Sequence, residues 1–149
     1  MIVRLSKSPE DTRDTAAWLI EKIDARGLMA LSGPLGAGKT EFARGVAHAL
    51  GIRKPVTSPT FTLHKTYPYT WEGQRRIFNH LDLYRVQSVK EVRAIGFKEL
   101  IADPEHLILV EWPEKIRGLL PYFTINIRLS YDKNPKERKI KISSRRSIR

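Results

Sequence analysis

Residues 28–40 have the sequence LMALSGPLGAGKT, and this stretch predicts the class of fold. Its first four residues form a continuous apolar run that is too short for a helix, so we predict a strand buried on both faces. Residues 33–40 match the pattern GxxxxGK[ST], in which a glycine-rich loop joins a strand to a helix. Phe42, Val46 and Leu50 follow at helical spacing and Gly51 ends the run, which predicts that helix.

The residue types in this loop suit phosphate binding. Glycines such as Gly33, Gly36 and Gly38 allow backbone N–H groups to curl around phosphate oxygens. The ammonium group of Lys39 can then reach the β- and γ-phosphates, and the hydroxyl of Thr40 can bind Mg²⁺. Because the loop also lies between a predicted strand and a predicted helix, we expect it to bind a nucleotide.

Two acidic residues follow or interrupt apolar segments. Glu111 closes the apolar run 107–110, where a carboxylate can reach Mg²⁺ directly or through water, and we prefer this role to that of an ordinary acid at a strand end. Asp82 lies between Leu81 and Leu83. It could position water or metal, or it could face solvent or pair with Arg85, and the sequence leaves these alternatives open.

The rest of the chain predicts an α/β fold of the P-loop NTPase type, with three layers, a mixed and mainly parallel central sheet, and an inserted antiparallel hairpin. The further elements expected are a strand at 2–5, a helix beginning after Ser8, hairpin strands at 61–69 and 76–84 joined around 71–73, a helical stretch at 88–100 interrupted at Gly96, and strands near an edge at 123–129 and 138–142. The four His show no metal-ligand spacing, and His80 is expected to be a strand neighbour of Asp82.

Composition limits the classes of protein that remain. The 149 residues include no Cys, 27 Lys and Arg against 16 Asp and Glu, and a formal charge of +11. These values exclude disulfide scaffolds and thiol chemistry, and no apolar run has the length of a membrane helix, so we expect a cytoplasmic protein with a polyanionic partner. We divide the chain into a domain at 1–132 and a basic strand or tail at 133–149, which is either solvated or an electrostatic arm for nucleic acid or an acidic protein.

Four segments, taken in order, resemble the bacterial TsaE (YjeE) family. They are GPLGAGKT at 33–40, SPTF at 58–61, DLYR at 82–85 and VEWP at 110–113, and the resemblance covers about residues 5–130. It implies a small ATPase that is required for threonylcarbamoyladenosine at position 37 of tRNAs reading codons that begin with A. The resemblance also implies that the protein acts with TsaD and TsaB, and that ATP hydrolysis resets this partner complex between turnovers.

The resemblance carries site roles onto matching positions of this sequence. Thr40 and Glu111 would hold Mg²⁺, Asp82 would serve catalysis, and Thr60 would belong to a switch-like segment. Contacts to ATP would come from Gly36, Ala37, Gly38, Lys39, Thr40 and Glu41. Pro34 departs from the family, whose members usually carry an acid there, but it removes none of these groups.

The sequence therefore predicts an Mg²⁺-dependent ATPase that is slow in isolation. Backbone amides and Lys39 would neutralise phosphate charge, Thr40 and Glu111 would fix the metal, and Asp82 would orient water. Two alternatives remain: a small-molecule kinase, for which the chain leaves little room, and a non-catalytic RNA-binding or assembly protein whose basic tail binds tRNA.

Overall fold

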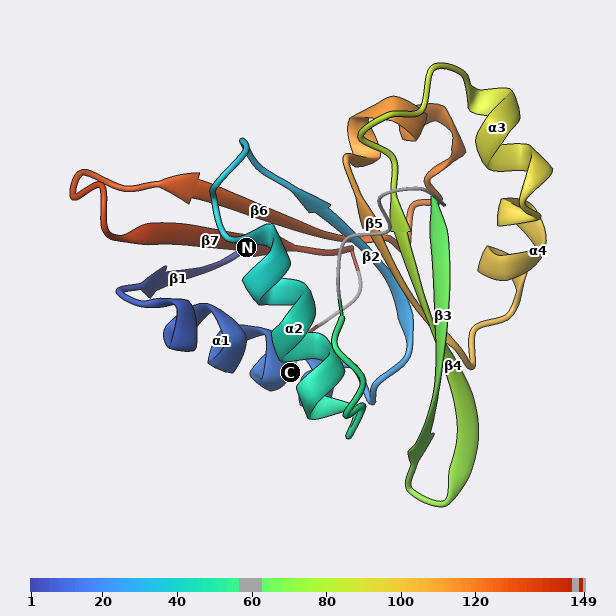
Figure 1. Ribbon diagram of the computed structural model, residues 1–149, viewed down its shortest axis with the longest axis horizontal. Coiled ribbons are helices and arrows are strands. Elements are labelled where there is room, and N and C mark those ends of the chain that lie inside the picture. The colour runs from blue at the N-terminus through green and yellow to red at the C-terminus, as the bar shows by residue number, and fades with distance from the viewer. Residues whose placement is uncertain (57–62, 146–147, 149) are drawn as a thin grey trace.

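A seven-stranded mixed sheet runs through the molecule in the order β1-β7-β6-β2-β5-β4-β3 (Figure 1). The computed structural model describes residues 1–56, 63–145 and 148. Its elements are β1 (Ile2–Ser6), α1 (Pro9–Lys22), β2 (Gly27–Ser32), α2 (Lys39–Ala49), β3 (His64–Trp71), β4 (Gln74–Asp82), α3 (Val89–Ala94), α4 (Phe97–Ala102), β5 (Leu107–Glu111), the 3₁₀ helix η1 (Pro113–Leu119), β6 (Ile125–Tyr131) and β7 (Arg138–Ser143). The four central strands are parallel to one another, and the outer pairs are antiparallel.

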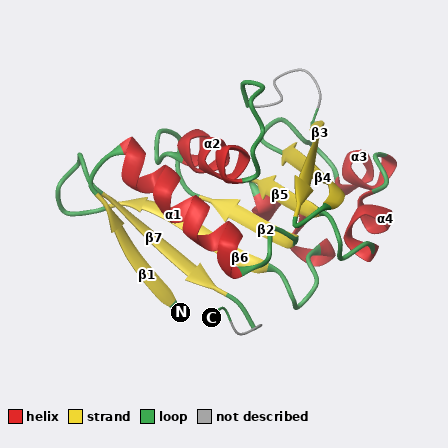
Figure 2. Ribbon diagram, turned by 90° about the horizontal axis from the view of Figure 1, so that it is seen from below, coloured by secondary structure: helices red, strands yellow, loops and turns green. Residues whose placement is uncertain are grey.

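Helices cover both faces of the central strands, which confirms the predicted three-layer arrangement. Along β5, Leu107 and Leu109 belong to the core under α1 and α2, whereas Ile108 and Val110 belong to the core under α3, α4 and η1. Figure 2 shows the two helix pairs on opposite parts of the sheet. Because every residue of β5 is buried, its sequence is apolar without alternation until Glu111.

Local signals place the helix ends where the sequence predicts them. Ser8 is the N-cap of α1, and its hydroxyl accepts a hydrogen bond from the backbone N–H of Asp11 at 3.1 Å. Pro9 occupies the first turn, where its missing N–H has no intrahelical partner to lose. The predicted interruption at Gly96 separates α3 from α4, with φ at 81°. None of the helices in the described part of the chain is long and apolar enough to cross a membrane.

Several predicted boundaries are corrected. The hairpin strand β3 extends through Trp71, so the turn is at 72–73 alone, and β4 ends at Asp82 before the predicted 84. Residues 61–62 of the predicted strand lie outside the described residues. The basic segment 138–142 is a strand near an edge, as predicted: β7 is second from the edge of the sheet, paired with β1 on one side and β6 on the other.

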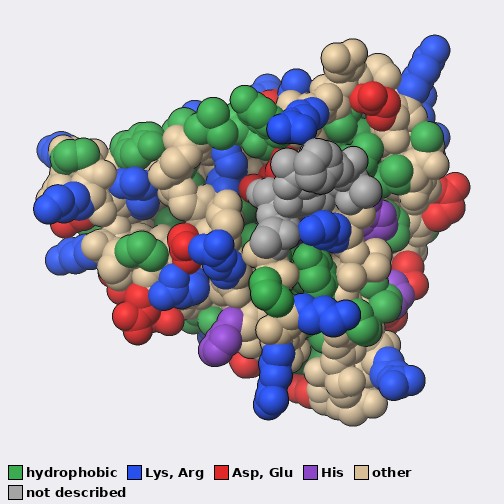
Figure 3. All heavy atoms as spheres, viewed as in Figure 1, with side chains coloured by type: hydrophobic (Ala, Val, Ile, Leu, Met, Phe, Trp, Pro, Cys, Tyr) green, Lys and Arg blue, Asp and Glu red, His purple; other side chains and the backbone are tan. Residues whose placement is uncertain are grey.

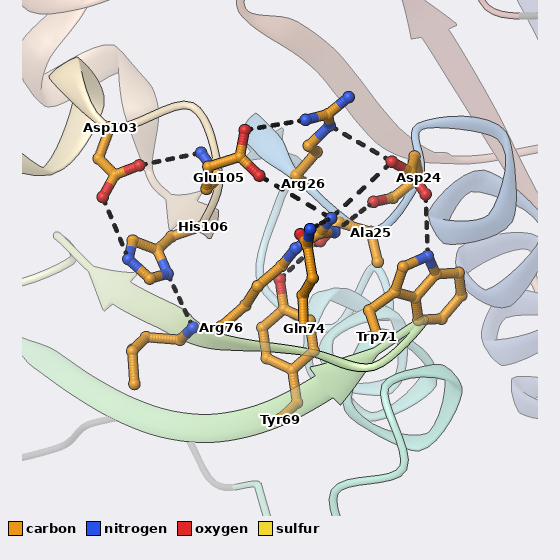
Figure 4. Close-up of polar contacts among 11 residues, drawn as sticks. Asp24, Ala25, Arg26, Tyr69, Trp71, Gln74, Arg76, Asp103, Glu105 and His106 are labelled. Atoms are coloured by element: carbon orange, nitrogen blue, oxygen red, sulfur yellow. Dashed lines mark hydrogen bonds and ion pairs between the residues drawn. The ribbon is translucent and has the colours of Figure 1, made fainter.

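A polar network ties the β3–β4 hairpin to the turn before β2 (Figure 4). Arg76 is only 5% exposed and donates to the carbonyl of Asp24 at 2.8 Å, while the hydroxyl of Tyr69 donates to the carbonyl of Ala25 at 2.6 Å. Burial raises the pKa of Tyr69 to about 12, so this hydroxyl remains a donor at neutral pH. The network lies at the N-terminal end of β2, at the other end of the strand from the glycine-rich loop.

The two helices on one face, α1 and α2, cross at a glycine. A Cβ atom at Gly45 of α2 would lie 2.5 Å from the carbonyl oxygen and 2.6 Å from the Cα of Arg13 in α1. These are backbone atoms, which cannot move aside as the end of a flexible side chain can. The crossing of α1 and α2 therefore requires glycine at this position.

We expect Gly45→Ala to lower the free energy of unfolding by about 2 kcal/mol, because overpacking outweighs the gain in helix propensity of about 1 kcal/mol. Gly118→Ala is the matched control, since a Cβ atom there meets nothing within 4 Å. Urea unfolding measures both. Equal stability of the two variants would mean that α1 and α2 separate without penalty.

Candidate nucleotide site

The glycine-rich loop connects β2 to α2 and lies against β6. Gly33 has a φ of 151°, and a Cβ atom there would lie 2.5 Å from the carbonyl oxygen of Leu129. Gly36 has a φ of 78°, and its Cβ would lie 2.9 Å from the hydroxyl of Tyr131. Both positions therefore favour glycine for backbone conformation, and Gly33 also requires it for space, because the atom beside it belongs to the backbone. The strand-loop-helix context expected for phosphate binding is confirmed.

Lys39 begins α2 and folds back over the loop. Its ammonium group donates to the carbonyl oxygens of Gly33 and Pro34, and it lies 3.9 Å from the centroid of the Trp112 ring. The residue is 8% exposed. Burial lowers the pKa of Lys39, and the negative charges of Glu111, Glu114 and Asp82 oppose that shift. A positive charge is thus held inside the loop, where phosphate oxygens would need one.

The two acids predicted for the site lie side by side. Asp82 and Glu111 are register partners at the ends of the parallel strands β4 and β5, and Leu31 of β2 pairs with Glu111 on its other side. The loop begins two residues after Leu31. Because carboxyl ends of parallel strands meet at one edge of the sheet, both carboxylates lie near Lys39, in agreement with their effect on its pKa.

Glu111 is held by a buried histidine. Nε2 of His80 lies 2.6 Å from Oε2 of Glu111, and both side chains are almost completely buried. With the carboxylate ionised, Nε2–H of His80 is the donor, which fixes the orientation of the Glu111 side chain. The sequence placed His80 beside Asp82 but did not reveal this contact, because the pairing depends on β4 and β5 being neighbours.

Of the other residues predicted to contact ATP, Glu41 lies within the described residues and Thr60 does not. The carboxylate of Glu41 makes ion pairs of 2.6 Å with Arg13 of α1 and Arg44 of α2, so only its backbone N–H remains to meet a phosphate. Thr60 and the rest of the predicted SPTF segment up to residue 61 lie outside the described residues. Thr40, whose hydroxyl is predicted to bind Mg²⁺, is exposed in the first turn of α2.

The hairpin of β6 and β7 supplies two contacts to the loop that sequence reasoning missed. The hydroxyl of Tyr131 donates to the carbonyl of Leu35 at 3.0 Å, and the guanidinium of Arg138 donates to the carbonyl of Gly36 at 3.3 Å. Arg138 also lies over the Tyr131 ring, 4.3 Å from its centroid. A signal for these residues exists, since Tyr131 and Arg138 continue the alternation of inward residues along their strands.

The two residues predicted to hold Mg²⁺, Thr40 and Glu111, both offer oxygen atoms. The described residues contain no group of three or more His, Asp or Glu that could hold a metal ion. Mg²⁺ in nucleotide sites uses one or two protein oxygens together with phosphates and water. The hydroxyl of Thr40 and the carboxylate of Glu111 are of the type that this coordination requires.

Comparison with known proteins decides the family. The family model described as threonylcarbamoyl adenosine biosynthesis protein TsaE matches residues 6–140. The chain belongs to the TsaE family. A TsaE protein of Treponema pallidum is 34% identical over 84% of this chain and 88% of its own length, and one of Rickettsia felis is 36% identical over 80% and 68%.

A solved structure is also similar to this TsaE family member. The crystal structure of Bacillus subtilis YdiB has a TM-score of 0.75 and 28% identity, covering 96% of this chain and 84% of that one. The predicted resemblance and the predicted α/β fold are therefore confirmed. Residues 6–140 include β7 up to its third residue, so the family match extends beyond the predicted boundary at 132.

We expect Tyr131→Phe to weaken ATP binding by about two- to tenfold, because it removes one hydrogen bond that holds the loop in shape and keeps the ring under Arg138. Tyr122→Phe is the control, since Tyr122 is 74% exposed and lies away from the loop contacts described above. Calorimetric titration with ATP measures both. Equal affinity of the Tyr131 and Tyr122 variants would contradict a role for the hairpin in shaping the loop.

The charge of Lys39 predicts a pH dependence. Its lowered pKa means that the ammonium group loses its proton below the ordinary value of 10.5, so ATP affinity is present below the Lys39 pKa and is lost as pH rises through it. Glu111→Gln removes a charge that raises this pKa, and the alkaline loss of affinity should move to lower pH. Glu99→Gln on α4 should leave the profile unchanged. Titration with ATP in the absence of divalent cations measures the effect, and a profile that does not move in Glu111→Gln would contradict it.

Proposed function

We propose that this TsaE family member hydrolyses ATP with Mg²⁺, and that this hydrolysis serves threonylcarbamoyladenosine formation in tRNA. The observation that carries the proposal is the position of the glycine-rich loop beside the paired strand ends of Asp82 and Glu111. Phosphate-binding groups and carboxylates that can act on metal and water thereby share one edge of the sheet. The tRNA role follows from the family and from the name of its members.

Each group has a physical task in this proposal. Backbone N–H groups of the loop and the ammonium group of Lys39 stabilise the negative charge on the phosphates. Thr40 and Glu111 would hold Mg²⁺, which when bound neutralises charge on the β- and γ-phosphates. Asp82, half-buried at the end of β4, would accept a hydrogen bond from the attacking water and orient it.

His80 acts as a positioning residue in this scheme. Its 2.6 Å contact with Glu111 holds one carboxylate oxygen toward β4. A carboxylate that is oriented before the ligand arrives loses little freedom on binding. In metal sites, ligating carboxylates are commonly oriented in this way by a hydrogen bond from a neighbouring residue that does not itself bind the metal.

TsaD and TsaB are the proposed partners, and we expect them to raise the rate of hydrolysis. Arg44, the arginine closest in sequence after the loop, is engaged with Glu41 at 2.6 Å. A cation that stabilises the transition state in related enzymes is commonly supplied by a partner protein. Slow turnover of the isolated protein and faster turnover in the complex follow from this view.

The test is ATP hydrolysis by the wild type, Glu111→Gln and Glu99→Gln, each alone and with the TsaD–TsaB complex. We expect the wild type and Glu99→Gln to be stimulated by the partners. Glu111→Gln should still bind ATP, while its turnover falls at least about 100-fold, because an interaction made in the transition state is lost.

Three outcomes would contradict the proposal or one of its assignments. Binding of ATP by all three proteins with no hydrolysis under any condition would favour a non-catalytic, nucleotide-stabilised assembly protein. Appearance of a phosphorylated small molecule in place of inorganic phosphate would favour a kinase. Equal turnover of Glu111→Gln and the wild type would remove Glu111 from the mechanism.

A further inference from the structure

One face of the sheet is left uncovered at β1, β7 and β6. The strands alternate, so Ile2, Ile140 and Ile127 face the core under α1 and α2, while the residues between them face the other way. Figure 1 shows α3 and α4 at the far side of the sheet, beside β3 and β4. Val3 and Leu5 are 52% and 54% exposed, as expected where no described element packs over them. We call the outward residues of these three strands the open face.

Like charges face each other on the open face. Arg128 of β6 and Lys141 of β7 are register partners, both are exposed, and neither makes an ion pair with a residue that the structure describes. Lys139, the next outward residue of β7, differs because it lies 3.8 Å from Asp132. Directly opposed like charges destabilise a sheet. The fold itself therefore gives no reason for the pair of Arg128 and Lys141.

A polar groove adjoins this pair. It has a volume of about 650 Å³ and lies between η1 with the segment after it and the ends of β6 and β7. Its lining includes Arg117, Arg145, Asn126 and Ser143, together with the aromatic ring of Tyr122, which is 74% exposed. The lining of the groove continues into the open face. Asn126 pairs with Ser143, and the next pair on the same face of the sheet is that of Arg128 and Lys141.

The charge on this side contrasts with the opposite face. Figure 3 shows the side of α1 and α2, where acidic and basic side chains are interspersed. The contacts there agree, because Arg13 and Arg44 are both paired with Glu41. In the groove the only acid among the lining residues described is Glu114. The cations Arg117 and Arg145 of the groove thus have one acidic residue among its described lining, and the open face adds the opposed pair of Arg128 and Lys141.

We propose that the groove and the open face bind tRNA directly. Arg128, Lys141, Arg117 and Arg145 contact backbone phosphates, and Tyr122 stacks on an unpaired base. The size of the groove suits a nucleotide, and its amide and hydroxyl groups suit base edges or ribose. An arrangement of cations, polar groups and an exposed aromatic ring is typical of sites for single-stranded RNA. This inference rests on the tRNA role in the proposed function.

The surface also reaches the nucleotide site. Ser32 pairs with Arg128 and lines the groove, and the next residue is Gly33 of the loop. RNA in the groove would therefore lie on one side of the end of β2, with the glycine-rich loop directly after it. The proposed RNA surface and the proposed ATP site are therefore adjacent at the C-terminal end of β2.

The experiment measures binding of unmodified tRNA transcripts by fluorescence anisotropy over a range of salt concentrations. We compare the full-length wild type with the double variant Arg128→Ala and Lys141→Ala. The matched control is Arg93→Ala with Lys98→Ala, which removes the same two charges from exposed positions on α3 and α4. Truncation of residues 133–149 is unsuitable because it removes β7 from the interior of the sheet.

For Arg128→Ala with Lys141→Ala, we expect at least about a tenfold loss of tRNA affinity near physiological salt. The slope of log affinity against log salt should become shallower by about 1.5, because two phosphate contacts are lost. Tyr122→Ala should lose about tenfold in affinity with the salt slope unchanged, since stacking releases no counterions. The control should match the wild type in both quantities.

Measurements of stability and of ATP hydrolysis distinguish a loss of RNA contacts from a structural defect and from a failure of the ATPase proposal. Removing an opposed like-charge pair should leave the unfolding midpoint equal or higher, whereas a structural role would lower it. ATP hydrolysis with TsaD–TsaB should stay at the wild-type rate in the absence of tRNA. If hydrolysis is absent in the wild type while tRNA binding follows the expected pattern, the ATPase proposal fails and the RNA surface remains.

Two results would overturn the RNA surface. One is a tRNA affinity and a salt slope that do not differ between the Arg128 and Lys141 double variant and its control. The other is an unchanged tRNA affinity combined with weaker binding of the double variant to TsaD–TsaB, which would assign the open face to an acidic protein surface.

Discussion

The close contact between β6 and the glycine-rich loop is the constraint on which the nucleotide site depends. The backbone carbonyl of Leu129 leaves no space for a Cβ atom at Gly33, and the hydroxyl of Tyr131 lies against Gly36. The curved loop is therefore packed closely against this strand. Glycine is usually explained by backbone freedom alone, but Gly33 is also required by the backbone of a neighbouring strand.

Local patterns were sufficient to predict the elements that carry the candidate site residues, because those patterns lie within short segments. The apolar run before Glu111 predicts a buried strand and places an acid at its end, and the order of strand, loop and helix around Lys39 is continuous in sequence. Those features need no knowledge of which strands are neighbours. The role of Asp82 was left open by the residues alone and was assigned by the TsaE resemblance. In the structure, β4 places Asp82 directly beside Glu111 of β5.

The features that sequence reasoning missed all depend on pairing between distant segments. His80 meets Glu111 only because β4 lies beside β5, and Arg138 reaches Gly36 only because β7 lies beside β6. The alternation at 138–142 predicts a strand, and β7 confirms it, but the basic composition of residues 133–149 left open whether the whole segment is a strand or a tail. The two neighbours of β7 depend on pairing with β1 and β6, which no local pattern specifies.

The position of β7 also sets the order in which the molecule can be completed during synthesis. In the described sheet β1 pairs with β7 alone, so β1 must wait for the synthesis of the distant β7 before it has a neighbour. Until then the apolar residues Ile2 and Leu5 have no strand beside them, and β6 lacks the partner that carries Arg138 to the loop. Long-range pairing of this kind slows folding. A nascent chain can therefore form the parallel centre before β7 is available, but it can bind nucleotide in the mature geometry only after β7 has left the ribosome.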